Sequence, residues 1–237
     1  MKIACASDIH GRWAELDYPN ADILILAGDI LSNYFRDRET DARMQMEELA
    51  SLDSFMKEMT SYKDIILISG NHEFCTLPSK EEQVRKICSN MHYLRDEAKV
   101  IQGKKIYGSP WQPHFFSWNF NFPDPKDNAA RARAHAVTCW DMIPNDTEIL
   151  ITHGPSYSVL DCVPPYLANG RDPHVGCPHL LNRVKTLPNL QLHVVGHIHS
   201  GYGQVRKDDW PSKPLVVNGS VCTEDYEPIN PIQVVEI

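Results

Sequence analysis

The sequence has little of what marks membrane, secreted or disulfide-stabilised proteins. Its 237 residues hold no apolar run close to the ~20 residues that a membrane span needs, and the stretch before Asp8 is too short for a signal peptide. Its seven cysteines are scattered and form no C-x-x-C pair, which favours reduced thiols over a disulfide framework. We therefore expect a cytoplasmic protein with no membrane partner.

Positive charge is also scarce. The formal net charge is -8, so no bulk basic field is available to attract nucleic acid or an anionic membrane. The chain has no stripe of lysine and arginine, which counts against a nuclease and against extended nucleic acid as a partner. A local basic groove or pocket would escape this test.

Repeats, low-complexity tracts and linkers are missing as well. The length is sufficient for one large α/β domain with a buried core, and the hydrophobic content of 42% is ordinary for a globular protein. Because nothing divides the chain, we expect a single domain over residues 1–237. The sequence predicts no oligomeric state.

Short apolar runs recur along the chain, each bounded by polar or glycine residues. Their length and their content of Ile, Leu and Val favour buried strands. These runs cover residues 3–6, 23–27, 65–68, 149–151 and 192–195. Additional strands are expected at residues 99–102 and 104–107, which flank Gly103, and at 214–218 and 232–237.

Apolar side chains at helical spacing lie between these runs. They predict helices over residues 40–62, 80–88, 126–142 and 176–187. We therefore expect an α/β (α+β) fold in which two sheets pack face to face with helices outside.

Seven residues that can bind metal stand just after the apolar runs. They are Asp8 and His10 in SDIHG, Asp29 in AGDI, Asn71 in SGNHE, His153 in THGP, and His197 and His199 in GHIHS. If the runs are strands, these residues lie at carboxyl ends of strands, where open α/β sheets place ligands. Their carboxylate, amide and imidazole groups suit Mn, Fe, Zn or Mg.

The spacing of these residues suggests how two ions would be held. Asp8 and His10 are two positions apart on an extended segment, so both point to one side and can chelate one ion. His197 and His199 have the same spacing. Asp29 is the one aspartate in its motif, which makes it the natural bridge between two ions. Such a pair lowers the pKa of a bridging water and binds phosphoryl oxygens.

The ordered set D-x-H, G-D, G-N-H-E, H-G and G-H-x-H resembles the calcineurin-like metallophosphoesterase superfamily. Longer stretches, among them IYGSPWQPHFFSWNFN, HVVGHIHSGYG and NGSVCTEDYEPINP, resemble the metallophosphoesterase-domain (MPPED) family over nearly the full chain. The resemblance implies a four-layer fold, with a two-sheet β-sandwich between helices and a dinuclear metal site at strand ends. It also implies hydrolysis of phosphodiesters, including cyclic nucleotides.

The resemblance further implies two ligand sets and a proton donor. His72 would be the general acid for the leaving alkoxide, after attack by a metal-bridging hydroxide. Asn71 would also contact the substrate phosphate. One ion would take Asp8, His10, Asp29 and His199, and the other Asp29, Asn71, His153 and His197.

One position departs from the superfamily pattern. Many members carry a second aspartate in G-D-x-x-D that orients the catalytic histidine, and here that position is Ser32. His72 is then held by another group or is a weaker acid. Glu73, the next residue, is expected to be structural.

Three further residues are candidates for substrate binding. Arg12 follows the first motif and suits a phosphoryl oxygen, although a surface arginine is the plainer interpretation. Residues 109–125 are rich in aromatics and prolines, and they either cap the core or line a pocket. In the second case Trp111 and Phe115 would stack against a base.

Three functions stay open at this point. The first is a metal-dependent phosphodiesterase that acts on small, cyclic-nucleotide-type substrates, with manganese as the expected metal and Fe, Zn or Mg as alternatives. The second is a phosphomonoesterase or protein phosphatase with the same site. The third is a non-catalytic scaffold, which the complete ligand set and His72 argue against.

Overall fold

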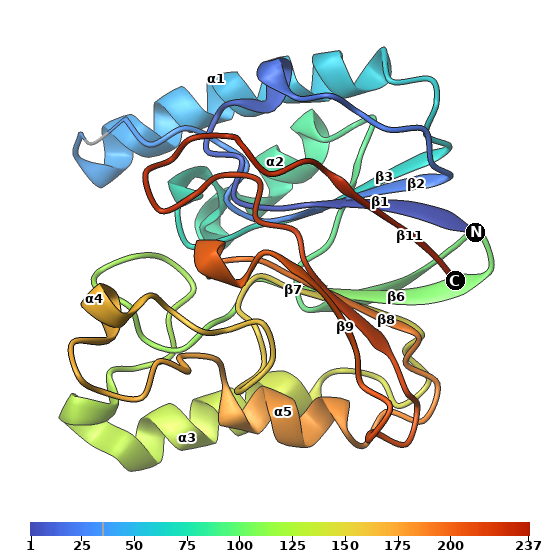
Figure 1. Ribbon diagram of the computed structural model, residues 1–237. Helices are drawn as coiled ribbons and strands as arrows, with labels where there is room; N and C mark the ends of the chain where they lie inside the picture. The colour runs from blue at the N-terminus through green and yellow to red at the C-terminus, as the bar shows by residue number, and fades with distance from the viewer. Residues whose placement is uncertain (35) are drawn as a thin grey trace.

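The computed structural model describes residues 1–34 and 36–237, and its strands form two sheets that face each other (Figure 1). The first sheet consists of β1 (Lys2–Ala6), β2 (Ile23–Ala27), β3 (Asp64–Ile68), β4 (His92–Tyr93) and β11 (Gln233–Glu236). They lie in the order β11-β1-β2-β3-β4. Strand β11 is antiparallel to β1, and the other pairs are parallel.

The second sheet also has a parallel centre with antiparallel edges. It consists of β5 (Glu97–Ile101), β6 (Lys104–Ser109), β7 (Ile149–Thr152), β8 (Leu192–Val195), β9 (Gly203–Arg206) and β10 (Leu215–Asn218). Their order is β5-β6-β7-β8-β10-β9. The two edge strands, β5 and β9, pair antiparallel with their neighbours, while β6, β7, β8 and β10 run parallel.

Helices cover the outer faces of both sheets (Figure 1). The first sheet carries α1 (Arg38–Lys57) and α2 (Glu81–Ile87), and the second carries α3 (Pro125–Asp141) and α5 (Pro178–Val184). A short helix, α4 (Pro165–Ala168), stands away from the sheets. The predicted fold, two mixed sheets flanked by helices, is therefore confirmed. Within the described residues, no helix is both long and apolar enough to span a membrane.

Alternation along β2 shows how the layers are built. Ile23 and Ile25 face the second sheet, whereas Leu24 and Leu26 face α1, and all four are fully buried. A strand with both faces covered must be apolar at every position, which is why ILILA reads as a continuous run. Full burial of each such side chain contributes roughly 1.5–3 kcal/mol relative to exposure.

The element bounds differ from the predicted ones mainly at ends and at short elements. Helix α1 begins after Asp37, whose carboxylate accepts the backbone N–H groups of Glu39 and Thr40. It ends at Lys57, short of the predicted residue 62, and the chain beyond it turns so that the Tyr62 hydroxyl donates to the Pro19 carbonyl. That residues 1–237 form one domain stays a prediction.

Candidate metal centre

The structure brings together residues from the ends of five strands. Three compact groups of candidate ligand atoms result, each with all atoms within 4.8 Å of one another. The groups are Asp8, His10 and His199; His10, Asp29 and His72; and Asp29, His153 and His197. Because β1, β2 and β3 of one sheet and β7 and β8 of the other end on the same side, residues nearly 200 positions apart converge.

The first group is built around Asp8. Its carboxylate accepts the Ser220 hydroxyl at 2.8 Å and the backbone N–H of His197 at 2.9 Å. The Nε2 atom of His199 lies 3.5 Å from Asp8 Oδ1 and 3.3 Å from His10 Nε2. Nδ1 of His199 donates to the Thr223 carbonyl at 2.8 Å. The Nε2 atom of His199 is therefore the one that faces the other ligand candidates.

The third group, Asp29, His153 and His197, is built around Asp29 and His153. Nδ1 of His153 donates to the Ala27 carbonyl at 2.9 Å. Its Nε2 faces Asn71 Oδ1 at 3.0 Å and Asp29 Oδ2 at 3.3 Å. Asn71, which could contribute an amide oxygen, thus joins Asp29, His153 and His197 at the second position.

The chemistry of these donor sets fits divalent cations. At both positions an imidazole Nε2 and neighbouring oxygen or nitrogen atoms point their lone pairs toward one another. Without a cation, only a proton on the imidazole holds such groups together. Burial acts to lower the pKa of His153, but the charge and hydrogen bond of Asp29 raise it to about 9. A divalent ion takes the place of that proton and binds the deprotonated ligands.

His199 resembles His153: burial acts to lower its pKa, but the hydrogen bond and charge of Asp8 raise it to about 9. His10 and His197 are already in the neutral form that binds metal. Burial lowers the pKa of His10 and of His197 to about 3, so both rings are neutral near pH 7. The nearby imidazoles hold the pKa of Asp29 well below its usual range despite burial, so this carboxylate is ionised.

The backbone at these strand ends adopts an uncommon conformation. Four candidate ligands, Asp8, His10, Asp29 and His197, have φ values of 51°, 48°, 53° and 67°. Asp, Asn and His are enriched in this left-handed region, and such strain is typical of functional sites. Backbone hydrogen bonds hold two of these residues, from Asp8 N to the Gly28 carbonyl and from His10 N to the Asp29 carbonyl, both at 3.0 Å.

Gly28 shows why a glycine precedes the aspartate. Its φ is +93°, and a Cβ atom there would lie 2.6 Å from His153 Nδ1 and 2.7 Å from the backbone nitrogen of Gly70. A larger residue would therefore push His153 and the β3 end away from Asp29.

His72 belongs to the group with His10 and Asp29 and has a partner that the sequence did not predict. Its Nδ1 is 2.6 Å from the Asn33 Oδ1, and its Nε2 is 3.8 Å from Asp29 Oδ2. The Trp118 ring stacks on the imidazole at a centroid distance of 4.0 Å. Asn33 and Trp118 thus fix the orientation of His72 from two directions.

Ser32, the position at which an aspartate was expected, faces elsewhere. Its hydroxyl donates to Glu48 of α1 at 2.9 Å. Glu73 is structural, as predicted, because its buried carboxylate accepts the backbone N–H groups of Asp29, Ile30, Leu31 and Gly70. Together these contacts hold the loop that carries Asp29 and Asn33.

Residues 1–201 match the family model described as calcineurin-like phosphoesterase. The chain is 35% identical over 258 residues to metallophosphoesterase domain-containing protein 1 of Homo sapiens and of Mus musculus, which covers 100% of this chain and 71% of each relative. The chain belongs to the calcineurin-like phosphoesterase family. A solved crystal structure shares the fold at 18% identity, with a TM-score of 0.54 over 92% of this chain and 89% of that chain.

Membership of this phosphoesterase family gives the converging residues a function. The protein is a metal-dependent phosphoesterase with a dinuclear divalent metal site, for which the groups above provide candidate ligands. The substrate is a small phosphoester.

A cavity of about 380 Å³ opens beside the phosphoesterase site. Phe115 and Phe116 line it and are 45% and 72% exposed, whereas Phe120 and Phe122 of the same aromatic segment are buried. The sequence left open whether this segment caps the core or lines a pocket. It does both, since part of it packs in the core and part lines the pocket.

Two predicted substrate contacts lie outside the lining of this cavity. The Trp111 indole donates to Asp96 at 2.9 Å and stacks against Phe122. The Arg12 guanidinium lies 3.4 Å from Glu15 and 3.4 Å from Glu227. Their roles in substrate binding stay predictions.

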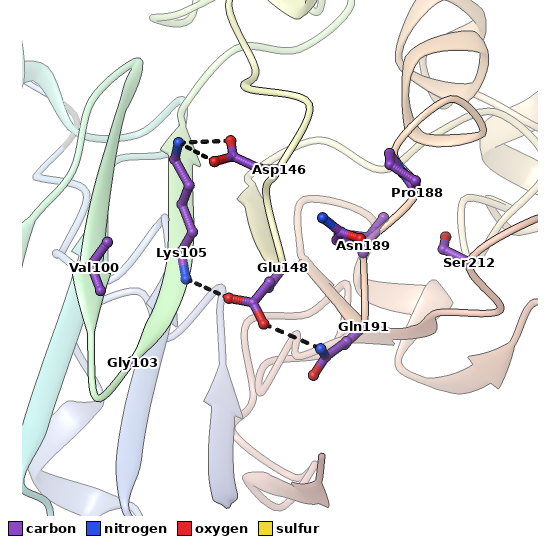
Figure 2. Close-up of a pocket in the computed structure, with 10 residues that line it drawn as sticks. Val100, Gly103, Lys105, Asp146, Glu148, Pro188, Asn189, Gln191 and Ser212 are labelled. Carbon is purple, nitrogen blue, oxygen red and sulfur yellow. Dashed lines mark hydrogen bonds and ion pairs between the residues drawn. The ribbon is translucent and has the colours of Figure 1, made fainter.

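A larger cavity of about 650 Å³ lies at the opposite ends of β6, β7 and β8 (Figure 2). Figure 2 shows that its charged groups pair with one another: Lys105 Nζ contacts Asp146 at 2.7 Å, and its backbone N–H reaches Glu148 at 3.0 Å. Among the described residues, no candidate metal group lies there. The cavity and the candidate metal ligands thus lie at opposite ends of these strands.

Proposed function

We propose that this phosphoesterase is a phosphodiesterase that acts on small, cyclic-nucleotide-type diesters, with manganese as its preferred metal. The observation that carries the proposal is the placement of an oriented His72 beside two ligand sets, at the wall of a cavity of about 380 Å³. A cavity of this size lies within the range typical of small-molecule sites. Exposed Phe115 in the wall offers a face against which a base can stack.

Each site residue has a role in this proposal. One ion would be held by Asp8, His10, Asp29 and His199, and the other by Asp29, Asn71, His153 and His197. When bound, such ions activate water and bind phosphoryl oxygens. The buried Nδ2 of Asn71 has no hydrogen-bond partner among the described residues, so it is free to donate to a phosphoryl oxygen.

His72 is the proposed general acid. Its Nδ1 is occupied by Asn33, so its Nε2, on the side of Asp29, is the atom that would protonate the leaving oxygen. This role matters most for alkoxide leaving groups, such as the ribose oxygen of a cyclic nucleotide, because an alkoxide is a poor leaving group without a proton.

The test compares esters, metals and variants side by side. The protein, loaded with Mn, Mg, Zn or Fe(II), is assayed with bis-p-nitrophenyl phosphate, p-nitrophenyl phosphate and a cyclic nucleotide. We expect diesters to be preferred and Mn to give the highest kcat/KM. Asp29→Asn and His72→Ala should each lower kcat/KM for the cyclic nucleotide by roughly 10²-fold or more.

Metal content distinguishes metal binding by Asp29 from proton donation by His72, because Asp29→Asn should lose bound Mn while His72→Ala keeps it. His92→Ala is the matched control, since His92 pairs with Asp64 in the first sheet and lies outside the three metal groups. Full activity in both site variants, or a preference for the monoester, would overturn the proposal. A protein that binds no metal would instead favour the scaffold.

A further inference from the structure

The cavity beside the metal centre lacks fixed positive charge. Its lining has apolar side chains from three segments, including Phe115, Leu167 and Val175, and two carboxylates, Asp29 and Glu224. Among the described residues that line it, there is no lysine or arginine. Apart from bound metal ions, only imidazoles, among them His72 and His199, are available in this wall to attract negative charge on a substrate.

Glu224 is held at the edge of the ligand groups. Its Oε1 accepts the backbone N–H of Ser200 at 3.2 Å, in the 3-10 turn His199–Gly201. The preceding residue, Thr223, accepts Nδ1–H of His199 through its carbonyl. The Thr223 carbonyl therefore fixes the ligand candidate His199, and the Glu224 carboxylate is held next to it.

No lysine or arginine forms an ion pair with this carboxylate in the described part of the chain. Glu15 and Glu227 form ion pairs with Arg12, whereas none of the ion pairs found there includes Glu224. The charge of Glu224 therefore acts on whatever occupies the cavity. The apolar walls around it reduce screening by water and strengthen that effect.

We infer that Glu224 is a specificity-determining residue that disfavours dianionic phosphomonoesters and so selects monoanionic diesters. This inference rests on the phosphodiesterase function proposed above. A monoester carries one more negative charge than a diester near neutral pH, and Glu224 repels it more strongly. The diester replaces that charged oxygen with a substituent, which can lie along the apolar wall of Phe115 and Leu167. Discrimination of this kind depends on repelling the wrong substrate.

The kinetic test uses two esters with the same leaving group, p-nitrophenyl phosphate and ethyl p-nitrophenyl phosphate. Glu224→Gln keeps the acceptor for Ser200 and removes the charge. We expect the monoester-to-diester ratio of kcat/KM to rise roughly fivefold in Glu224→Gln and further in Glu224→Lys. Asp225→Asn is the matched control, because it removes the neighbouring charge, which does not line this cavity.

An equilibrium measurement separates this inference from the proposed function. Calorimetry at pH 8 with the Mn-loaded protein compares inorganic phosphate with dimethyl phosphate. Glu224→Gln should tighten binding of inorganic phosphate roughly fivefold more than that of dimethyl phosphate. If the wild type cleaves neither ester, the proposed function fails while this comparison still tests Glu224. Unchanged ratios in both Glu224 variants would overturn the inference.

Discussion

At the scale of single residues, the partner of His72 is the least expected feature of the site. Asn33 offers a neutral amide oxygen to Nδ1, at 2.6 Å, whereas an aspartate at the position of Ser32 was expected to orient the ring. An amide orients the ring as a carboxylate does, but it lends no negative charge to a protonated imidazole. Orientation is therefore the main contribution of Asn33.

Replacing Asn33 should affect the substrates that need a proton donor. We expect Asn33→Ala to lower kcat by roughly tenfold or more for an alkyl leaving group, and much less for p-nitrophenolate, which leaves without protonation. Asn33→Asp should restore activity toward the alkyl ester, because it keeps an acceptor at the same place. The measurement is kcat across a series of diesters whose leaving groups differ in pKa.

Ser32→Ala is the control for this series, since its hydroxyl contacts Glu48 and not His72. A loss of the same size for every leaving group would indicate general damage to the loop. Asn33 would then have no specific role in orienting His72.

The residues of the site differ in how far the sequence predicts them. The seven ligand candidates stand in short motifs directly after strands, so adjacency along the chain predicts their convergence, and the structure places them together. Asn33 and Trp118 could not be found in this way. Their contacts with His72 depend on how the loop after Asp29 turns toward α1 and where the aromatic segment folds back, and both are tertiary features.

At the scale of elements, the hydrophobic periodicity of the sequence predicted the long helices and strands and missed the short ones. Strands β2 and β8 agree with the apolar runs to the residue, because both of their faces are buried. Strand β4 has two residues and α4 has four, too few for any period to show. Strand β9 alternates between half-buried and exposed positions at a sheet edge, so it carries no apolar run.

Strand β8 also contains a buried titratable residue outside the ligand groups. His193 is fully buried, and its Nε2 lies 2.9 Å from the Thr152 hydroxyl. Burial lowers its pKa from 6.5 to about 3. Above pH 6.5 the ring is neutral in both the folded and unfolded states. Below it, the unfolded chain binds a proton that the folded protein excludes, so stability falls as the pH falls.

The expected size of this effect follows from linkage. At pH 5, His193 should cost the folded state about 2 kcal/mol relative to pH 7. His193→Gln keeps a group that can contact Thr152 but does not titrate, so it should lose less stability over this range. Urea unfolding of both proteins at pH 7 and pH 5 measures the difference. An equal loss in the two proteins would show that His193 does not stay neutral in the fold.

At the scale of the whole molecule, the metal centre joins the two sheets. Four of the seven ligand candidates, Asp8, His10, Asp29 and Asn71, follow strands of the first sheet, and His153, His197 and His199 follow strands of the second. The apolar layer between the sheets holds them together along their length. The ligand groups lie at one end of that layer, where carboxylates and imidazoles take the place of aliphatic side chains.

Metal binding should therefore stabilise the molecule as a whole and not only order the site. An unfolded chain cannot keep ligands that come from positions as distant as 8 and 199 together, so the ions bind the folded state selectively. At a metal concentration about 100 times the Kd, this selectivity is worth about 2.7 kcal/mol per site, which corresponds to a rise in Tm of roughly 5–10 °C for a chain of this size. Calorimetric scans with and without Mn, after chelator treatment, measure the shift.

The variant Asp29→Asn tests whether this carboxylate bridges the two ions of the dinuclear site or serves one of them alone. Asp29 Oδ2 faces His153 at 3.3 Å, and its carboxylate also belongs to the group that contains His10. If it bridges, its replacement weakens both ions together, and nearly all of the Mn-dependent rise in Tm should disappear. Asn71 belongs only to the second ligand set, so Asn71→Ala should remove about half of the Mn-dependent rise in Tm. Equal effects of the two variants would mean that Asp29 serves one ion alone, and the two ligand sets would then have to be reassigned.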